Sequence, residues 1–263
     1  MKLTATIITL NEAANIRDAC ESAAWADEII VVDSGSTDET CEIAASCGAR
    51  VIKNEWPGFA AQKQFAVEFA TQEWILSLDA DERVSPQLKT EIERLKTKPD
   101  AQLADGYLIP RRSFYQDRWI KGGGWYPDWQ LRLFRKSSGN WEPRLIHESV
   151  KMKPGSRIER LSSDILHYSV RDAAHHHRMI GERYAPLAAA QMLAEGRSTS
   201  PVKIAIAAPA AFIRSFVLKG GFRDGVAGLT IASFAAHHAF LKHVMLWEKQ
   251  KEVGSKQSGR DVS

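Results

Sequence analysis

The sequence predicts an α/β protein with a mostly parallel sheet, helices on both faces of that sheet, and a C-terminal helical extension. Within residues 1–100, short β-branched runs alternate with segments whose apolar residues recur at helical spacing. Repeated strand–helix–strand units of this kind build parallel sheets that are covered by helices. From residue 171 onward the apolar spacing is helical only, which predicts the extension.

Each element of the expected sheet region has its own local signal. Strands are expected at residues 3–9, 28–32, 49–53 and 73–78, and helices at residues 12–24 and 59–70. Ser36 and Glu39 have the spacing of a capping box, which predicts a helix start at Ser36. Ser85 followed by Pro86 predicts another helix start, with the serine as N-cap.

The chain changes character after residue 104. Short strands are expected at residues 106–110, 130–135, 145–148 and 158–161, between loops rich in glycine, tryptophan and tyrosine. We therefore expect three parts, residues 1–104, 105–170 and 171–263.

The composition sets limits on the class of protein. With 263 residues, 44% of them hydrophobic and 25% charged, the chain is neither disordered nor collagenous nor a long coiled coil. A net charge of +3 gives no reason to expect a nucleic-acid partner. The three cysteines, Cys20, Cys41 and Cys47, are too few for a disulfide framework, so a cytoplasmic location is expected.

Polar residues directly follow three of the expected strands. They are Asn11, Asp33 and the pair Asp79 and Asp81. Ligands of parallel sheets bind at the carboxyl ends of the strands, so these side chains are expected to converge on one edge. Two carboxylates this close repel unless a cation or a proton lies between them. Oxygen ligands suit Mg²⁺ or Mn²⁺, which usually take one or two carboxylates together with substrate phosphates.

The motif Asp79-Ala-Asp81 has other possible interpretations. Such a pair is often only a solvated loop cap, but its place after a buried strand, with Asp33 at another strand end, favours a binding site. Phosphatases with an aspartate nucleophile place this motif on the first strand and follow it with threonine or valine, where this chain has Arg83. No GxGxxG follows the first strand and no GxxxxGK[ST] occurs, which argues against dinucleotide oxidoreductases and P-loop NTPases.

Three motifs together resemble family 2 glycosyltransferases of the GT-A fold. They are ITLNE over residues 8–12, VVDSGSTD over residues 31–38 and LDADE over residues 78–82. Further segments are similar to the bacterial lipopolysaccharide inner-core β-glucosyltransferases that act on heptose, namely WADE at 25–28, WPGF at 56–59, GWYPD at 124–128, RLF at 132–134 and HE at 147–148. The similarity extends to about Trp247.

The resemblance implies a role for each matching residue. The nucleotide base would be lined by Thr9, Leu10, Asn11 and Glu12. Asp33 would bind uracil or ribose, Asp79 the ribose, and Asp81 the metal on the diphosphate. Lys63 lies where many family members carry an arginine beside the nucleotide; it offers a point charge and no bidentate fork. Residues 1–104 would then bind the nucleotide sugar and residues 105–170 the acceptor.

The implied reaction is an inverting transfer of a hexose, glucose, from a UDP-sugar to a lipopolysaccharide core or related envelope glycolipid. A general base must accept the proton of the acceptor hydroxyl, and Glu148 and Asp128 are the two candidates. Glu148 is preferred because it follows a strand and His147 precedes it; either acid has an ordinary structural alternative. Two other functions stay open, a sugar-phosphate nucleotidyltransferase and a non-catalytic nucleotide-sugar-binding protein.

The C-terminal region suggests a partner of another kind. From Pro201 onward the chain has nine Lys and Arg residues but only four acids, and two apolar stretches flank the segment 219–223. This pattern is typical of helices that lie on an anionic membrane, which here would be the inner face of the cytoplasmic membrane. Helices that pack on the catalytic domain would show the same pattern. The run His175–His177 is interpreted as structural, because consecutive helical residues point in different directions.

Overall fold

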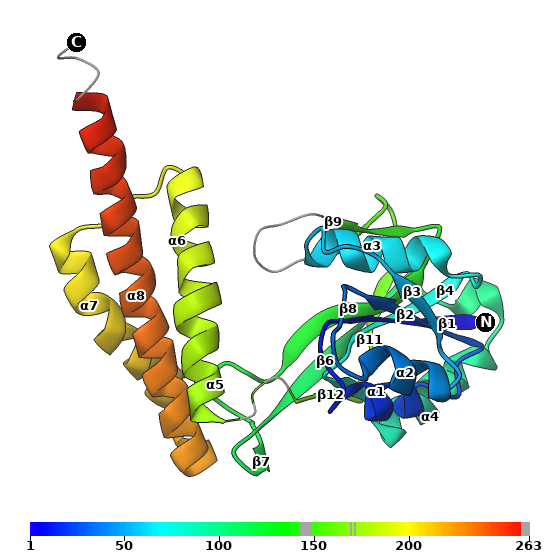
Figure 1. Cartoon of the computed structure of the whole chain (residues 1–263). Coiled ribbons are helices and arrows are strands. Elements are labelled where there is room, and N and C mark those ends of the chain that lie inside the picture. Colours follow the sequence, from blue (N-terminus) through cyan, green and yellow to red (C-terminus); the bar gives the residue numbers. More distant parts are fainter. Residues whose placement is uncertain (143–148, 169, 171, 259–263) are drawn as a thin grey trace. The chain divides into compact units, whose positions relative to one another are not determined.

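The structure is a computed structural model that describes residues 1–142, 149–168, 170 and 172–258 (Figure 1). It divides into two compact units. The sheet unit comprises Met1–Ser113 and Pro127–Ser169, and the helical unit comprises Phe114–Tyr126 and Val170–Ser263. Each unit is described by itself.

Four parallel strands form one half of the sheet. Their order is β3 (Arg50–Lys53), β2 (Glu28–Asp33), β1 (Leu3–Thr9) and β4 (Trp74–Asp79). Thr9 is paired with Asp33, and Ile8 with Asp79. The carboxyl ends of β1, β2 and β4 are therefore level, and the expected strands and their common polar edge are confirmed.

The second half of the sheet is mixed in direction. Its strands are β5 (Glu82–Val84), β6 (Gly106–Tyr115), β8 (Asp128–Arg135), β11 (Ile158–Arg160) and β12 (Ile165–His167). β8 pairs antiparallel with β4 and with β6, β12 and β11 pair parallel with β6, and β5 pairs antiparallel with β12. β6 is longer than the expected strand at 106–110, because its end also pairs with β7 (Arg118–Trp119).

The link between β4 and β5 forces the sheet to curl. Only Ala80 and Asp81 separate these two strands in the chain, yet β5 lies at the far end of the strand order from β3, next to β12. β12 must therefore curl round to reach β5, and its His167 is paired with Glu82. A second, two-stranded sheet joins β9 (Gly139–Glu142) and β10 (Ser149–Met152). The strand expected at 145–148 lies outside the described residues.

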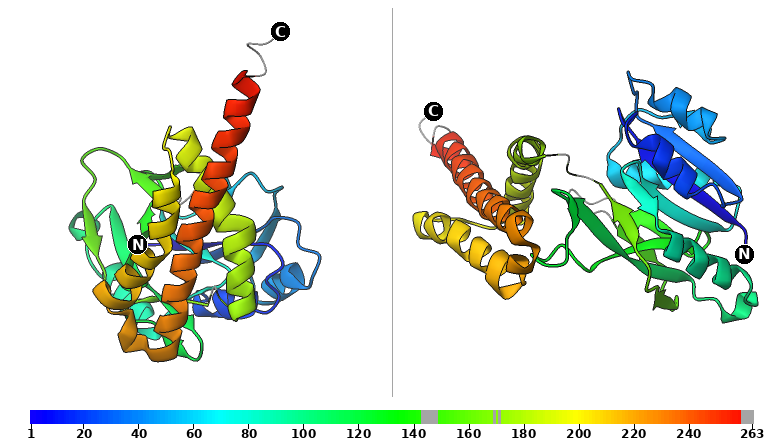
Figure 2. Two further views of the ribbon diagram at one scale, coloured as in Figure 1. Left: turned by 90° about the vertical axis from the view of Figure 1, so that its left-hand side faces the viewer. Right: turned by 90° about the horizontal axis from the view of Figure 1, so that it is seen from below.

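Helices cover both faces of the parallel half, as predicted. On one face, α1 (Ile16–Ser22), α2 (Thr40–Ser46) and α4 (Pro86–Lys96) join a core cluster with the odd-numbered residues of β1. On the other face, α3 (Phe59–Phe69) packs with Ile8, Ile30 and Val32. Figure 1 shows α3 on one side of the sheet and α1, α2 and α4 on the other, and the right-hand view of Figure 2 looks onto the side with α1, α2 and α4. The mixed α/β class of the sequence prediction is therefore confirmed.

One of the two predicted helix starts is wrong. α2 begins at Thr40 with Glu39 as its N-cap, not at Ser36, because the Ser36 hydroxyl donates to Asp33 in the preceding turn. Asp38 instead accepts from the Thr40 backbone N–H at 3.1 Å. The other start is confirmed, since Ser85 Oγ accepts from the backbone N–H of Leu88 at 3.1 Å.

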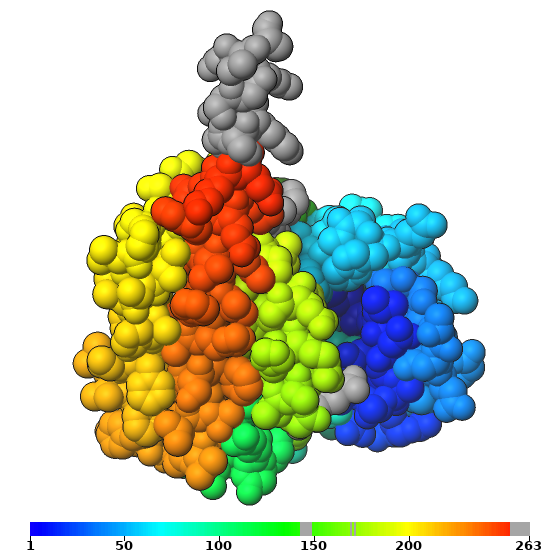
Figure 3. Space-filling view, turned by 60° about the vertical axis from the view of Figure 1, so that its left-hand side comes forward, coloured from blue at the N-terminus to red at the C-terminus, as the bar shows by residue number. Residues whose placement is uncertain are grey.

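The helical unit confirms the expected C-terminal extension. It contains α5 (Ala173–Arg178), the π-helical segment η2 (Met179–Tyr184), α6 (Ala185–Ala194), α7 (Pro201–Ile213), the π-helical η3 (Arg214–Leu218), the 3₁₀ segment η4 (Gly221–Asp224) and α8 (Gly225–Ser258). α6 and α7 both pack on α8 (Figure 3). Gly228 lies so close to η4 that a Cβ there would be 1.8 Å from the carbonyl oxygen of Gly221, so only glycine fits.

Candidate functional site

The loops that follow β1 and β2 are held to each other by hydrogen bonds. The Asn11 backbone N–H donates to Ser36 Oγ at 2.8 Å, and the Thr37 backbone N–H donates to Asn11 Oδ1 at the same distance. Asn11 has a φ of 53°, in the left-handed region that asparagine tolerates better than most residues. Leu10 beside it is 47% exposed, while Thr9 is buried at the strand end.

Asp33 builds the turn after β2. Its side chain is buried, and its carboxylate accepts from the backbone N–H groups of Gly35 and Ser36, both at 2.9 Å, and from the Ser36 hydroxyl. Asp33 thus fixes the loop that holds Asn11. Its expected role toward the nucleotide stays a prediction.

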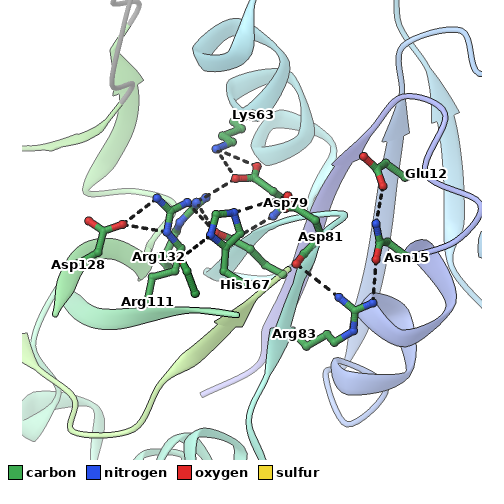
Figure 4. A network of polar contacts seen from close by, with 12 residues as sticks. Glu12, Asn15, Lys63, Asp79, Asp81, Arg83, Arg111, Asp128, Arg132 and His167 are labelled. Atoms are coloured by element: carbon green, nitrogen blue, oxygen red, sulfur yellow. Dashed lines mark hydrogen bonds and ion pairs between the residues drawn. The ribbon is translucent and has the colours of Figure 1, made fainter. Parts of the chain in front are cut away.

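A second chain of contacts runs from Glu12 to Arg83 (Figure 4). The Glu12 backbone N–H donates to Thr40 Oγ1 at 2.9 Å, and Glu12 Oε2 accepts from Asn15 Nδ2 at 2.7 Å. Arg83 Nη2 donates to Asn15 Oδ1 at 3.1 Å, and Arg83 Nη1 lies 3.4 Å from the carbonyl oxygen of Asp81. The β1 loop is therefore connected to the turn that carries Asp81.

Asp79 lies between two buried cations. Lys63 Nζ, on α3, is 2.9 Å from Asp79 Oδ1, and Arg132 Nη2, on β8, is 3.0 Å from Asp79 Oδ2. The two cationic side chains are only 1% and 3% exposed. Both also lie over the ring of Trp141, at 4.8 Å for Lys63 Nζ and 5.8 Å for the Arg132 guanidinium carbon.

These charges decide the protonation of Asp79. Burial alone would raise the pKa of the Asp79 carboxyl, but the charges of Lys63 and Arg132 outweigh it and hold that pKa well below its usual range. Asp79 is consequently an anion over the whole physiological pH range. It can accept hydrogen bonds, but it is unsuited to accept a proton.

The network continues across the sheet through Glu82, which is fully buried. Glu82 Oε1 accepts from Arg132 Nη2 at 2.9 Å and from Arg111 Nη1 at 3.1 Å, and Glu82 Oε2 accepts from the Asp79 backbone N–H at 3.0 Å. Arg111 in turn holds Asp128 through Nε at 2.9 Å and Nη2 at 2.7 Å. Three cations and three carboxylates thus alternate from Lys63 to Asp128. Figure 4 labels all of these residues except Glu82.

Asp128 is therefore anchored in this structure. Arg111 and Asp128 are cross-strand partners of β6 and β8, which puts their side chains on one face. Asp128 Oδ1 also accepts from Gln130 Nε2 at 2.7 Å. The other base candidate, Glu148, lies outside the described residues together with His147.

Asp81 has a different environment from Asp79. Its carboxylate oxygen Oδ2 lies 3.5 Å from His167 Nε2, and His167 Nδ1 lies 3.1 Å from Ser113 Oγ. Asp81 is 22% exposed. Among residues 1–142, 149–168, 170 and 172–258, no three His, Cys, Asp or Glu side chains are grouped closely enough to hold a metal by themselves. Asp81 and His167 are two potential ligands, one oxygen and one nitrogen.

Sequence reasoning missed several members of this site. Glu82 lies in the LDADE motif, but no role was predicted for it, and none was predicted for Arg111 or His167. Arg132 and Arg135 lie on opposite faces of β8, since Arg132 lies over Trp141 while Arg135 lies over Trp74. The period-2 alternation of side chains along a strand gives residues three positions apart opposite directions.

Comparisons with known proteins identify the family of this chain. The family model of glycosyl transferase family 2 matches residues 4–155. The lipopolysaccharide core biosynthesis glycosyltransferase LpsC of Rhizobium meliloti (strain 1021) is 30% identical over 261 residues, which cover 95% of this chain and 93% of that protein. An uncharacterized glycosyltransferase of Rickettsia bellii (strain RML369-C) is 30% identical over 275 residues, covering 99% and 91%.

Solved structures are more distant. S. aureus TarS 1–349 in complex with UDP-GlcNAc is 14% identical with a TM-score of 0.47, covering 96% of this chain and 92% of that one. Glucosyl-3-phosphoglycerate synthase from Mycobacterium tuberculosis, in complex with Mn²⁺, UDP and glucosyl-3-phosphoglycerate, is 25% identical with a TM-score of 0.35. That match covers 44% of each chain, so this chain spans less than half of the synthase.

Proposed function

The chain belongs to glycosyl transferase family 2, and on this basis we propose that it transfers glucose from UDP-glucose to a lipopolysaccharide core or related envelope glycolipid, with inversion. The observation that carries the proposal is the polar edge at the end of β4, where Asp79 lies between two buried cations and Asp81 lies beside His167. The similarity to LpsC over nearly the whole chain supports the acceptor class.

In this proposal the two joined loops receive the nucleoside. Residues 9–12 line the base, and Asp33 keeps the neighbouring turn in shape by its backbone contacts. Asp79 accepts a hydrogen bond from the ribose; it is about a quarter exposed and permanently anionic, so it suits this role. Lys63 and Arg132 fix the Asp79 carboxylate, which spares the cost of ordering it when the donor binds.

Asp81 and His167 are the residues that we propose for a divalent cation. The Asp81 carboxylate suits Mg²⁺ or Mn²⁺, which commonly complete their coordination with substrate phosphate and water, and the His167 imidazole would be a further, nitrogen ligand that Mn²⁺ accepts more readily than Mg²⁺. Ser113 orients the imidazole through its other ring nitrogen. When bound, such a cation stabilises the negative charge of the departing diphosphate as a Lewis acid.

The acceptor then attacks from the opposite face of the sugar. Its hydroxyl gives its proton to a carboxylate, its oxygen bonds to C1, and the bond from C1 to the diphosphate oxygen breaks, releasing UDP. We propose Glu148 as the base. Asp128 is the alternative, but Arg111 and Gln130 occupy its carboxylate oxygens in this structure.

Analysis of the products that the full chain forms tests the proposal. We expect UDP-glucose and a core glycolipid extracted from a bacterial envelope to yield UDP and glucosylated glycolipid. A chelator should stop the transfer, and added Mn²⁺ should restore it. Formation of UDP-glucose and pyrophosphate from UTP and glucose 1-phosphate would indicate a nucleotidyltransferase, and UDP binding without any turnover would indicate a binding protein; either result contradicts the proposal.

A further inference from the structure

One face of α7 and η3 in the helical unit is apolar and exposed. The exposed fraction is 69% for Val202, 57% for Ile206, 51% for Ile213 and 53% for Val217. These residues recur at intervals of four or seven positions, which places them along one side of a helix. We call these four residues the apolar stripe. The opposite side, at residues 204, 207, 208, 211, 212, 215 and 216, is half-buried or buried.

The segment is too exposed for a core helix, and its charge-free apolar run is shorter than a typical membrane span. Pro201–Leu218 is the single candidate span by length and hydropathy within the described residues, and only 6% of it is buried. Its charge-free apolar run extends only from Ile204 to Ile213, between Lys203 and Arg214. A span needs about 20 such residues, whereas runs of about 10–14 that are not core helices are interfacial or re-entrant.

The charge around the apolar stripe is of one sign. Residues 196–247 contain a single acid, Asp224. Its buried carboxylate accepts from the backbone N–H groups of Lys121, at 3.1 Å, and Gly122, at 2.7 Å. The same segment contains the basic residues Arg197, Lys203, Arg214, Lys219, Arg223 and Lys242.

The basic residues nearest the stripe lie on one of its flanks. At about 100° per residue, Lys203 and Arg214 both fall on the same side of the line through Val202, Ile206 and Ile213. Long basic side chains in this position can keep their charge at the level of lipid phosphates while their stems cover apolar surface. An apolar stripe with a basic flank and no exposed acid is complementary to an anionic lipid surface.

We propose that α7 and η3 lie in the plane of an anionic membrane leaflet. The apolar stripe enters the boundary between headgroups and acyl chains, and Lys203 and Arg214 contact the lipid phosphates. This inference extends the proposed function, since a glycolipid acceptor lies in the same membrane. Vesicle binding needs neither donor nor acceptor, so a failure of one proposal is distinguishable from a failure of the other.

Sedimentation of the full chain with vesicles tests the stripe. We expect enrichment on phosphatidylcholine vesicles that contain phosphatidylglycerol, and little on phosphatidylcholine alone. The variant I206N/I213N should bind the anionic vesicles at least about tenfold more weakly. The matched control is I158N, because Ile158 is an isoleucine of similar exposure, 44%, on β11 of the sheet unit. Equal binding of I206N/I213N and wild type would overturn the proposal.

The charge variant provides an independent test. K203Q/R214Q should bind anionic vesicles about tenfold more weakly, since each basic residue near the surface contributes roughly fivefold or less. The remaining binding should depend less on salt. K89Q/R94Q, which removes two exposed basic residues of α4, should bind as wild type. If high salt did not release the protein from bacterial membranes, the in-plane contact with lipid would be contradicted. A stable dimer of the wild type that dissociates in I206N/I213N would contradict it as well.

Discussion

The two units of the molecule treat their buried basic groups in opposite ways. In the sheet unit, Lys63 and Arg132 are almost wholly buried, and each is paired with a carboxylate. In the helical unit, His176 is buried beside Tyr115 and Phe234, and burial lowers its pKa to about 4, so that it is neutral at pH 7. Paired charges thus hold the carboxylates of the sheet unit in place, whereas the helical unit buries this histidine uncharged.

The largest effect should come from breaking the paired charges of the sheet unit. R132M leaves Glu82 and Asp79 each with one cation fewer in a buried site, so the free energy of unfolding should fall by about 3–5 kcal/mol. Urea denaturation measures this. The control R135M removes an arginine from the same strand whose partner Asp100 is exposed, and it should cost about 1 kcal/mol. Equal losses would mean that the buried pairing has no special weight.

A smaller effect should come from the neutral histidine of the helical unit. The unfolded chain binds a proton at His176 below about pH 6.5, whereas the folded chain does so only near pH 4, so stability is lost as the pH falls through this range. We expect a loss of up to about 3 kcal/mol between pH 7 and pH 4 that is reduced in H176F. Urea denaturation at several pH values, followed by circular dichroism, measures it.

His177 provides the matched control for that pH dependence. Its side chain is exposed, one position further along the same helix. H177F should therefore keep the slope of stability against pH that wild type shows. A slope that H176F leaves unchanged would show that His176 is not the group responsible.

The smallest effect concerns the loop that precedes α2. S36A removes the hydroxyl that donates to Asp33 and accepts from the Asn11 backbone N–H, which should cost about 1–2 kcal/mol in urea denaturation. S46A, which removes an exposed hydroxyl from the end of α2, should cost less than about 0.5 kcal/mol. If both variants were equally stable, the contact between the two loops would have no energetic role.

Some features of the molecule could be predicted from the sequence, and others could not. The parallel strands and the polar edge follow from local periodicity and from residues that sit directly after strands. The pairing of Asp79 with Arg132 does not, because it depends on β8 running antiparallel beside β4 from a distant part of the chain. His167 reaches Asp81 only because the short turn after β4 makes the sheet curl.

Local signals also failed where a side chain had two possible partners. Ser36 has the sequence spacing of a helix cap, but its hydroxyl donates to the buried Asp33 carboxylate and accepts from the Asn11 backbone N–H, and α2 begins at Thr40. A capping-box pattern cannot reveal such partners, since one of them lies on another loop.

Turnover of D81N with saturating UDP-glucose and envelope glycolipid tests the central claim most directly. If Asp81 supports the departing diphosphate, turnover should fall by at least about 100-fold, equivalent to about 2.7 kcal/mol, while the circular dichroism spectrum stays that of wild type. The control D100N alters an exposed carboxylate of the same unit and should turn over normally. Turnover of D81N within about twofold of wild type would contradict the account.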